Sequence, residues 1–482
     1  MKLVTDTLWI FFGNSVSRLI SGIFTIVLAR FIGLDYYGIF VLALTCGAIF
    51  SQVADLGLQQ TYIKVVNQNR GLIVSNNLNT TTLWLRVMLA IVSCVLFYIY
   101  SSFFIENNYK LLVCSLVVPY IFSVTIFNFV QGIDFSEHNM RSAANNKVLQ
   151  SIGLVISCSI ILFFTKESAD AGKILNYTYG LIALAISVAL LYLKLDKLKK
   201  INKFNVGQVK LLLNGIGGFW WTSMLYILSP QLPLLILQGF VSATVYGGFS
   251  LIYRLPLVLL MIPVSVSQSF YPKLFKAAGT FNEYNRLIKI EALFLAVAGL
   301  MLSLTLNISS STIIKVLIKP DDLTLIKNLD IAFSVVSWLI AIVSLSQPYA
   351  HILMTTNNQL KRAVAQSCVL LLGAGLYFYV SIDASIINIA WATLIIELGL
   401  LFVYVLMVYL YYSKELIRDI AKVVFPVILI CIVAKSAHYT LMTFNIIGLS
   451  TDIAILCLCT LCQILVVHYL YKKVQMHEVL TK

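Results

Sequence analysis

Charged side chains are scarce in this sequence. Asp, Glu, Lys and Arg make up only 11% of its 482 residues, whereas a typical soluble domain contains about 25%. Hydrophobic residues make up 60%. A chain with so few charges cannot cover itself with a water-compatible surface, which excludes an ordinary soluble domain. The composition predicts a protein that lies in a lipid bilayer.

Motifs of the common enzyme classes are also missing. The chain has no GxxxxGK[S/T] nucleotide loop, no HExxH zinc motif and no GxSxG nucleophile turn. Its nine cysteines stand singly, except for Cys457, Cys459 and Cys462, which have no second cluster to complete a metal site. No loop is long enough to fold as a separate domain. We therefore expect neither an enzyme, nor a cofactor, nor a metal site.

Long apolar runs fill most of the chain instead. A helix of about 20 apolar residues crosses the hydrocarbon core of a membrane and satisfies its own backbone hydrogen bonds. The runs predict an all-α polytopic membrane protein with about 14 transmembrane helices. These lie near residues 8–32, 37–62, 82–105, 110–132, 148–165, 174–193, 211–238, 243–270, 288–307, 329–354, 363–382, 386–412, 423–443 and 446–471.

Basic residues are unevenly spread along the chain. It holds 34 Lys and Arg against 20 Asp and Glu, and most of the basic residues fall in alternate loops, beginning with the N-terminal segment. The most basic stretch is LKLDKLKKINKFNVGQVK at 193–210. Membrane proteins gather Lys and Arg in cytoplasmic loops. This pattern predicts cytoplasmic N- and C-termini, and it accounts for the net charge without a nucleic-acid partner.

A short internal repeat divides the chain. The segment Tyr37-Gly38-Ile39-Phe40 matches Tyr246-Gly247-Gly248-Phe249 at an offset of 209 residues (37 to 246). Both copies would start in the cytoplasm, so the repeat is parallel. It predicts an N-terminal lobe of six helices over 1–200, a C-terminal lobe of six over 201–412, and a peripheral helix pair with a cytoplasmic tail over 413–482. Such repeats hold the substrate site between them and move to give alternating access.

Two arginines lie deep within predicted helices. Arg18 stands near the middle of the first span and Arg254 at a similar depth in the eighth. Ions inside membrane helices are costly and are usually kept for function. The guanidinium fork matches phosphate oxygens and stays charged, so both arginines are predicted to bind a phosphate or pyrophosphate. The alternative is that each only pairs with an acidic neighbour such as Asp55 or Glu397.

Four further charged residues lie nearer the ends of the predicted spans or could form an ion pair. Arg30 and Arg86 are candidate substrate contacts or interfacial anchors. Asp55 could pair with Arg18 or Arg86, or carry a proton. Glu397 could be a proton or cation site, or part of a salt bridge.

Prolines interrupt the helices that begin the second half. Pro230 and Pro233 in the seventh span, with Pro256 and Pro263 in the eighth, would kink these helices as part of a gate, or are simply tolerated there. Nearby residues that could contact a sugar are Trp220, Trp221, Tyr226 and Gln231. The histidines His351 and His438 fall toward span ends and are expected to have no special role.

The opening of the chain carries a family resemblance. Its first 65 residues contain FFGNSVSRLISGIFTIVLARFIGLDYYGIFVLALTCGAIFSQVADLGL. The landmarks are Arg18, Gly22, Leu28-Ala29-Arg30, Gly33, Tyr37-Gly38 and Asp55-Leu56-Gly57. This stretch resembles the polysaccharide transporters of the multidrug/oligosaccharidyl-lipid/polysaccharide (MOP) exporter superfamily, and most of all the Wzx-type flippases for O-antigen or capsule repeat units.

The resemblance implies a function and a fold. It implies a flippase in the bacterial inner membrane that moves an undecaprenyl-pyrophosphate-linked oligosaccharide from the cytoplasmic to the periplasmic leaflet. The fold would be two lobes in a MATE-like V around a cationic cavity. Related lipid II flippases use arginines of their first and eighth helices, which Arg18 and Arg254 match here. Partners would be the lipid-linked substrate, the membrane, and the polymerase and chain-length machinery.

Two other functional classes stay open. A cation-coupled MATE-like drug exporter would share the fold but favour carboxylates in its cavity, which Asp55 and Glu397 could supply. A membrane-embedded polysaccharide polymerase or ligase would place catalytic arginines in a long periplasmic loop, and the sequence has no such loop.

Overall fold

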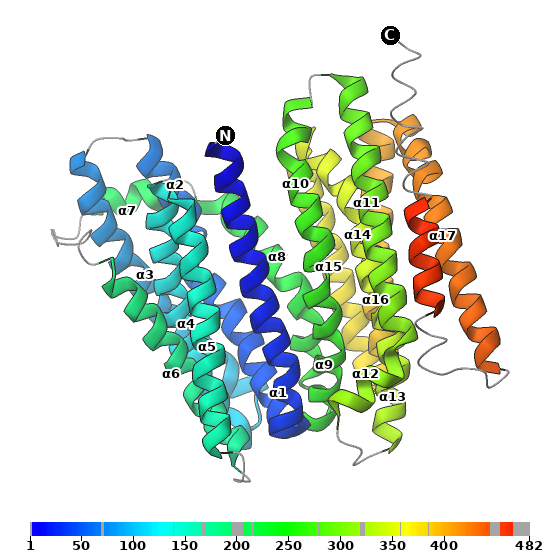
Figure 1. Ribbon diagram of the computed structural model, residues 1–482. Helices are drawn as coiled ribbons and strands as arrows, with labels where there is room; N and C mark the ends of the chain where they lie inside the picture. The colour runs from blue at the N-terminus through cyan, green and yellow to red at the C-terminus, as the bar shows by residue number, and fades with distance from the viewer. Residues whose placement is uncertain are drawn as a thin grey trace. The chain divides into compact units, whose positions relative to one another are not determined.

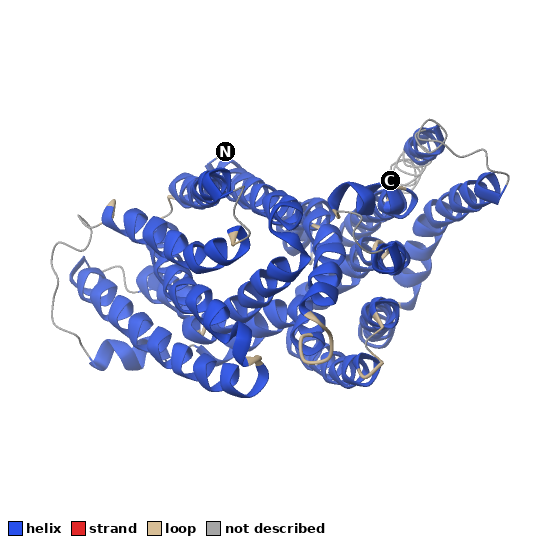
Figure 2. Ribbon diagram, turned by 90° about the horizontal axis from the view of Figure 1, so that it is seen from below, coloured by secondary structure: helices blue, strands red, loops and turns tan. Residues whose placement is uncertain are grey.

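The computed structural model describes most of the chain. The described residues are 2–68, 72–137, 139–165, 170–194, 206–213, 216–277, 280–318, 323–356, 358–383, 385–443 and 454–465. Within these ranges all regular structure is helical (Figures 1 and 2). The predicted all-α membrane fold is confirmed. The residues form two compact units, 1–250 and 251–482, each of which is described by itself below.

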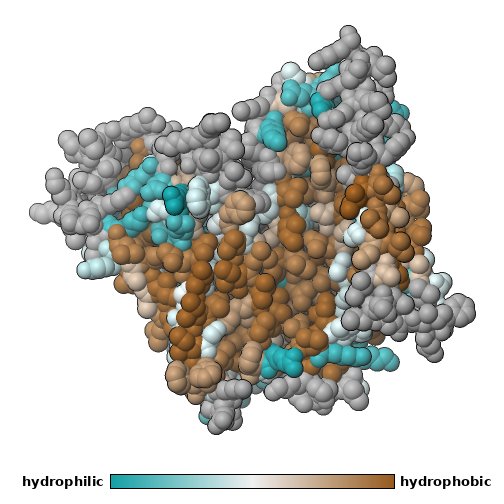
Figure 3. Space-filling view, in the orientation of Figure 1, coloured by the Kyte–Doolittle hydropathy of each residue, from teal (hydrophilic) through white to brown (hydrophobic). Residues whose placement is uncertain are grey.

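Apolar side chains cover the exposed sides of the helices. Figure 3 shows hydrophobic residues over most of the visible face, with hydrophilic residues gathered near helix ends. Exposed residues include Phe163, Phe164 and Leu371. In water such a surface would be an aggregation patch, whereas in a bilayer it faces lipid. Among the described residues, ten stretches are long and apolar enough to cross a membrane, and two shorter apolar helices lie at Ile227–Leu237 and Ala454–Leu465.

The first helix contains two of the predicted spans. Helix α1 runs from Lys2 to Asp55, 54 residues, or about 80 Å at 1.5 Å per residue. A bilayer core is only about 30 Å thick. Gly33 breaks the helix with φ 76° and ψ 160°, a conformation open to glycine because it lacks a Cβ. A second break follows at Leu56 and Gly57, which also have positive φ.

The first unit continues with shorter helices packed on α1. They are α2 (Leu58–Gln68), α3 (Leu72–Phe104), α4 (Asn107–Ser136), α5 (Met140–Thr165), α6 (Ala171–Tyr192), α7 (Val206–Leu213), α8 (Ile216–Leu237) and the first half of α9 (Ala243–Leu259). Helix α1 packs against α4, α5 and α8, and α4 packs against α6. Because α8 packs on α1, it belongs to this compact unit. The lobe boundary predicted at 200/201 concerns the repeat and stays a prediction.

The second unit is built around α11. After the end of α9, its helices are α10 (Met261–Ala277), α11 (Phe281–Ile308), α12 (Ser310–Leu317), α13 (Leu323–Val336), α14 (Leu339–Thr355), α15 (Gln359–Ser381), α16 (Ile386–Tyr411) and α17 (Lys414–Thr443). Helices α10, α14 and α17 pack against α11. Buried Val427, Cys431 and Cys459 belong to its core. Helix α17 and residues 454–465 are thus integral to this unit.

Two further predicted spans are each split into two helices. The predicted span 243–270 breaks at Leu260, between α9 and α10. Pro263 explains the position, because proline has no N–H to donate to the carbonyl four residues back and its ring clashes with that carbonyl. Helix α9 accordingly ends at Leu259. The other split falls in 329–354, between α13 and α14.

Side chains satisfy the backbone at the second break. The Asn307 Nδ2 group donates to the Ser334 carbonyl at 2.6 Å, and the Ser337 hydroxyl donates to the same oxygen at 2.8 Å. Such replacement bonds are what allow irregular backbone at membrane depth. Lys435 of α17 donates to Asn307 Oδ1. Lys435 is therefore tied to the core of its unit.

Residues related by the predicted repeat touch each other. Thr244 donates a hydrogen bond to the Asp35 carboxylate, and the two residues are 209 positions apart. Gly38 and Gly247, separated by the same offset, also meet: a Cβ on Gly247 would lie 3.0 Å from the Gly38 nitrogen. Only glycine permits backbones to approach this closely.

Replacing Gly247 with alanine is expected to lower the melting temperature of the purified protein. The new methyl group would lie 2.0 Å from the Leu34 carbonyl oxygen, and overpacking of this kind costs about 1–3 kcal/mol. The matched control is Gly375→Ala on α15, where no other part of the protein lies within 4 Å. That variant should melt at or above the wild-type temperature. Equal melting of Gly247→Ala and wild type would contradict the close contact.

Candidate functional site

Arg18 lies on the exposed side of α1 beside a second cation. Its neighbour Ser17 points toward α5, where the two hydroxyls of Ser17 and Ser151 are hydrogen bonded. One turn before Ser151, Lys147 donates to Asn14 Oδ1 at 2.8 Å. The charge of Lys147 interacts with that of Arg18. Arg18 is exposed and forms no ion pair with any described residue.

Sequence reasoning missed Lys147. The span predicted at 148–165 leaves Lys147 in the preceding loop. In the structure α5 begins at Met140, so Lys147 lies two turns inside the helix and is half-buried. The signal was present: the chain has neither Gly nor Pro between residues 140 and 152, and nothing stops a helix there. Two like charges in neighbouring helices repel each other, and an anion bound between them would relieve the repulsion.

Arg254 lies in α9, directly before the Leu255-Pro256 step. Its side chain is half-buried, and it forms neither a hydrogen bond nor an ion pair within the described ranges. The acidic partner considered for it, Glu397, is half-buried on α16. Glu397 lies within electrostatic range of Tyr253 and Tyr377, and it too has no ion pair among the described residues.

Arg86 occupies neither of its two predicted settings. Its Nη1 atom lies 2.6 Å from Asp55 Oδ1, with side-chain exposures of 1% and 4%. The same nitrogen lies 3.5 Å from the Thr125 carbonyl oxygen. Asp55 is the last residue of α1, where the helix dipole disfavours a negative charge. The buried Arg86 guanidinium compensates both the carboxylate and the negative end of the helix dipole. In this structure Arg86 is thus closed to a substrate, and it does not snorkel to an interface. Of the two partners considered for Asp55, the structure gives Arg86.

The remaining predicted site residues lie as follows. Arg30 is exposed, three residues before the break at Gly33. Pro230 and Pro233 lie inside α8, Pro256 inside α9 and Pro263 in the first turn of α10. Gln231 accepts a hydrogen bond from Thr45 at 3.1 Å. The Trp220 and Trp221 rings are neighbours, 6.3 Å apart. The side chain of Tyr226 lies outside the described residues.

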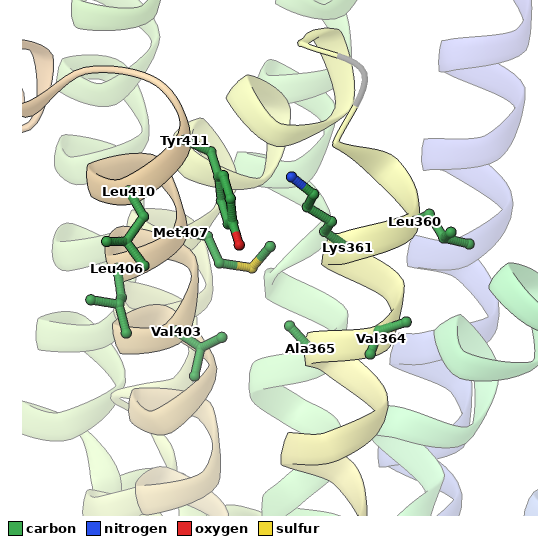
Figure 4. Close-up of a pocket in the computed structure, with 9 residues that line it drawn as sticks. All are labelled: Leu360, Lys361, Val364, Ala365, Val403, Leu406, Met407, Leu410 and Tyr411. Carbon is green, nitrogen blue, oxygen red and sulfur yellow. The ribbon is translucent and has the colours of Figure 1, made fainter.

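A hydrocarbon-lined groove runs between α15 and α16 (Figure 4). Its volume is about 380 Å³, and its walls include Val364, Val403 and Met407. At one end the Lys361 ammonium group lies 3.8 Å from the centre of the Tyr411 ring. A groove with apolar walls of this kind suits an acyl or isoprenoid chain, since such walls cannot form hydrogen bonds with a sugar.

Solved structures with this arrangement of helices are membrane transporters. The structure of "Lipid II flippase MurJ, inward closed conformation" aligns with a TM-score of 0.71 and 13% identity, covering 96% of this chain and 98% of that one. An inward-facing multidrug resistance MATE transporter of the MOP superfamily gives 0.65 and 10%, covering 86% and 96%. An MOP transporter from Pyrococcus furiosus gives 0.53 and 14%, covering 87% and 96%. The fold is that of MOP transporters.

The sequence supplies the family. A family model described as "Polysaccharide biosynthesis protein" matches residues 3–278. This is more than half of the chain, so the protein belongs to that family. No curated protein sequence matches the chain significantly. Family and fold together are those of a polysaccharide transporter of the MOP superfamily rather than of an enzyme.

Removing Arg86 alone is expected to be strongly destabilising. Arg86→Met leaves Asp55 as an uncompensated buried charge, which typically costs about 3–5 kcal/mol. The double variant Arg86→Met with Asp55→Asn removes both charges and should recover most of the lost melting temperature. If the double variant melts no higher than Arg86→Met, the pair is not the source of the stability.

Proposed function

We propose that this protein is a flippase for an anionic, lipid-linked oligosaccharide. The observation that carries the proposal is that Arg18, beside Lys147, and Arg254 lie in apolar helices without an ion pair to any described residue. Arg86 shows the contrast, since it is neutralised by Asp55. Cations in such helices that the described carboxylates leave unpaired are suited to an anion that comes and goes.

The chemistry favours a phosphate ester as that anion. A guanidinium donates two parallel hydrogen bonds to phosphate oxygens, and it keeps its charge in apolar surroundings. A pyrophosphate has oxygens enough for more than one such contact. We propose that Arg18 and Arg254 bind the pyrophosphate, with Lys147 assisting Arg18 and with Arg30 on the entry path.

The family and the fold support a substrate that is attached to a hydrocarbon chain. A polysaccharide biosynthesis family model matches this membrane chain and a lipid II flippase shares the fold, which together support a sugar attached to a lipid as the substrate. The finer assignment is an undecaprenyl-pyrophosphate-linked O-antigen or capsule repeat unit, and it rests on the Wzx-like opening of the chain. Delivery to a polysaccharide polymerase and its chain-length machinery would follow.

Transport would proceed by alternating access across the bacterial inner membrane. Lys and Arg in alternate loops support cytoplasmic termini, hence export from the cytoplasmic leaflet. The helix break at Leu260 lies between Pro256 and Pro263, and helix breaks of this kind let a segment move without unfolding. We propose these prolines, with Pro230 and Pro233, as elements of the gate.

A cation-coupled drug exporter is the second candidate. It is favoured by Glu397, a half-buried carboxylate without an ion pair among the described residues, and by the MATE fold. A cationic substrate, however, would be repelled by Arg18 and Lys147. The flippase explains all three cations, so it is preferred.

Complementation tests the proposal directly. In a strain lacking this gene, lipid-linked repeat units should accumulate in the cytoplasmic leaflet, and the intact chain should restore their transfer and the surface polysaccharide. Arg18→Ala and Arg254→Ala should each reduce export at least tenfold, because a charged hydrogen bond is worth about 1.5–3 kcal/mol. Arg18→Lys should retain part of the export, since it keeps the charge without the fork.

A matched control is Lys110→Ala, which removes a half-buried lysine that contacts Ser102 and Tyr98. It should export normally. Loss of protein in the arginine variants, in proportion to their loss of export, would favour a structural role for the two arginines. Normal surface polysaccharide in the deleted strain, together with altered sensitivity to cationic drugs, would favour the exporter.

A further inference from the structure

A buried polar cluster joins three helices of the second unit. It consists of Glu291 on α11, His351 on α14 and Ser267 on α10. The His351 Nδ1 atom lies 2.7 Å from Glu291 Oε1, with side-chain exposures of 9% and 0%. The Ser267 hydroxyl donates to the same carboxylate oxygen at 3.0 Å, and it lies 3.4 Å from His351 Nε2. No sequence pattern singles out Glu291, and His351 was expected to have no special role.

The partner of Glu291 distinguishes it from the other buried carboxylates. Three acidic side chains are buried in the described part of the chain: Asp55, Asp134 and Glu291. Asp55 pairs with Arg86 and Asp134 with Lys194, each at 2.6 Å. Arginine keeps its charge and lysine ordinarily loses its proton only near pH 10, whereas histidine is the side chain that exchanges a proton in the physiological range. Of these three carboxylates, only Glu291 pairs with a histidine.

The donors and acceptors of the cluster indicate how many protons it holds. The hydrogen of Ser267 is used toward Glu291, so its oxygen can accept only from His351 Nε2–H. Nδ1 and Oε1 then share one further proton, which is formally on either residue. In both forms the pair is neutral overall. Loss of that proton would leave a full negative charge with no exposed surface, which is costly in apolar surroundings.

We propose that the Glu291–His351–Ser267 cluster is the proton-binding site that couples transport to a transmembrane pH gradient. The proposal rests on the transport function proposed above. In one conformation the pair takes up one proton from water on one side. In the other conformation it releases that proton to water on the opposite side. No bond of the substrate is made or broken, and each cycle moves one proton.

The position of Ser267 links this site to the substrate. It lies thirteen residues after Arg254 (267 against 254), on the same predicted span that is broken at Leu260. At 1.5 Å per residue the two are about 20 Å apart along the helices. Loss of the shared proton removes the hydrogen bond between Glu291 of α11 and His351 of α14 and leaves a negative charge against the Ser267 hydroxyl of α10. A buried charge of this kind is costly, so the packing of the segment that continues from α9 has to change. Proton release and movement of Arg254 would then be two consequences of one rearrangement.

Several charged and titratable groups on the surrounding helices have partners outside the cluster. Lys289 of α11 lies 3.5 Å from Asp419 of α17. Arg362 of α15 bonds Tyr404 of α16, and Asp330 of α13 accepts from Ser310. Tyr284 of α11 is buried, interacts electrostatically with Glu291 and is hydrogen bonded to Thr355. The other charged and titratable side chains described on α10 to α17 are Lys273, Glu283, Arg286, Lys315, Lys327, Tyr349, Lys361, Cys368, Tyr377, Tyr379, Glu397, Tyr409, Tyr411, Tyr412, Lys414, Glu415, Arg418, Lys422, Cys431, Lys435, His438 and Tyr439.

Proteoliposomes with an imposed pH gradient test the proposal. The probe is a fluorescent polyisoprenyl-pyrophosphate saccharide whose leaflet is read by a membrane-impermeant quencher, with the membrane potential held at zero by potassium and valinomycin. One proton exchanged per substrate supports about a tenfold difference between leaflets for each pH unit. The wild type should reach this difference. Glu291→Gln and His351→Gln should equilibrate the probe between leaflets without responding to the gradient.

Two controls separate a proton site from a structural role. Asp134→Asn removes a buried carboxylate paired with lysine, and Lys289→Gln removes a charge two residues from Glu291; both should keep the gradient response. Glu291→Asp keeps a carboxylate and should retain part of it. Wild-type transport that is indifferent to the gradient, or a Glu291→Gln variant that still follows it, would overturn the proposal and leave the flippase intact.

A measurement that does not depend on transport tests proton binding by the cluster when the protein moves no probe. Infrared difference spectra of the purified protein, recorded between acidic and alkaline pH, should contain a carboxyl band that disappears in Glu291→Gln but persists in Asp134→Asn. If the wild type moves no probe under any gradient, the flippase assignment fails, and this band alone decides whether the cluster binds a proton. Its absence from the wild type would overturn the proton site.

Discussion

A charge within the apolar helices must be neutralised, and most of this structure's polar architecture follows from that constraint. Water cannot compensate an ion there, so a protein group or a ligand must do so. Asp55 is matched by Arg86 and Asp134 by Lys194, at 2.6 Å in each case. These pairs tie helices of the first unit together. A charge that lacks such a partner indicates a functional site, because the free-energy cost of placing it in apolar surroundings has to be offset by function.

The cations divide sharply on this criterion. Arg86 is enclosed and paired, whereas Arg18 is exposed beside Lys147, and Arg254 has no ionic partner among the described residues. Both arginines were singled out from their depth in the predicted spans, whereas Arg86 was placed nearer a span end as a substrate contact or an interfacial anchor. What separates a structural arginine from a candidate ligand contact is the tertiary neighbour. The same reasoning, applied to the carboxylates, isolates Glu291 with its histidine.

The sequence predicted the helices well because hydrophobic length is a local property. The repeat stays a prediction, although Asp35 and Thr244, which it relates, are bonded to each other. Breaks were predictable only where their cause is local. Pro263 explains the end of α9, whereas the break near Ser337 depends on Asn307 from another helix. The Glu291–His351 pair could not be foreseen, because its members are 60 residues apart in the sequence (291 and 351) and meet only through the packing of α11 on α14.

The central claim is that positive charge in apolar helices selects an anionic lipid, and a comparison of two lipids tests it most directly. Reconstituted protein would be given a polyisoprenyl-pyrophosphate saccharide and, separately, the uncharged saccharide on the same polyisoprenyl chain. Transfer between leaflets would be followed for each. The account predicts rapid transfer of the pyrophosphate lipid and no transfer above protein-free vesicles for the uncharged one. Equal transfer of both lipids would contradict it, because recognition would then not depend on the charge that the arginines are positioned to bind.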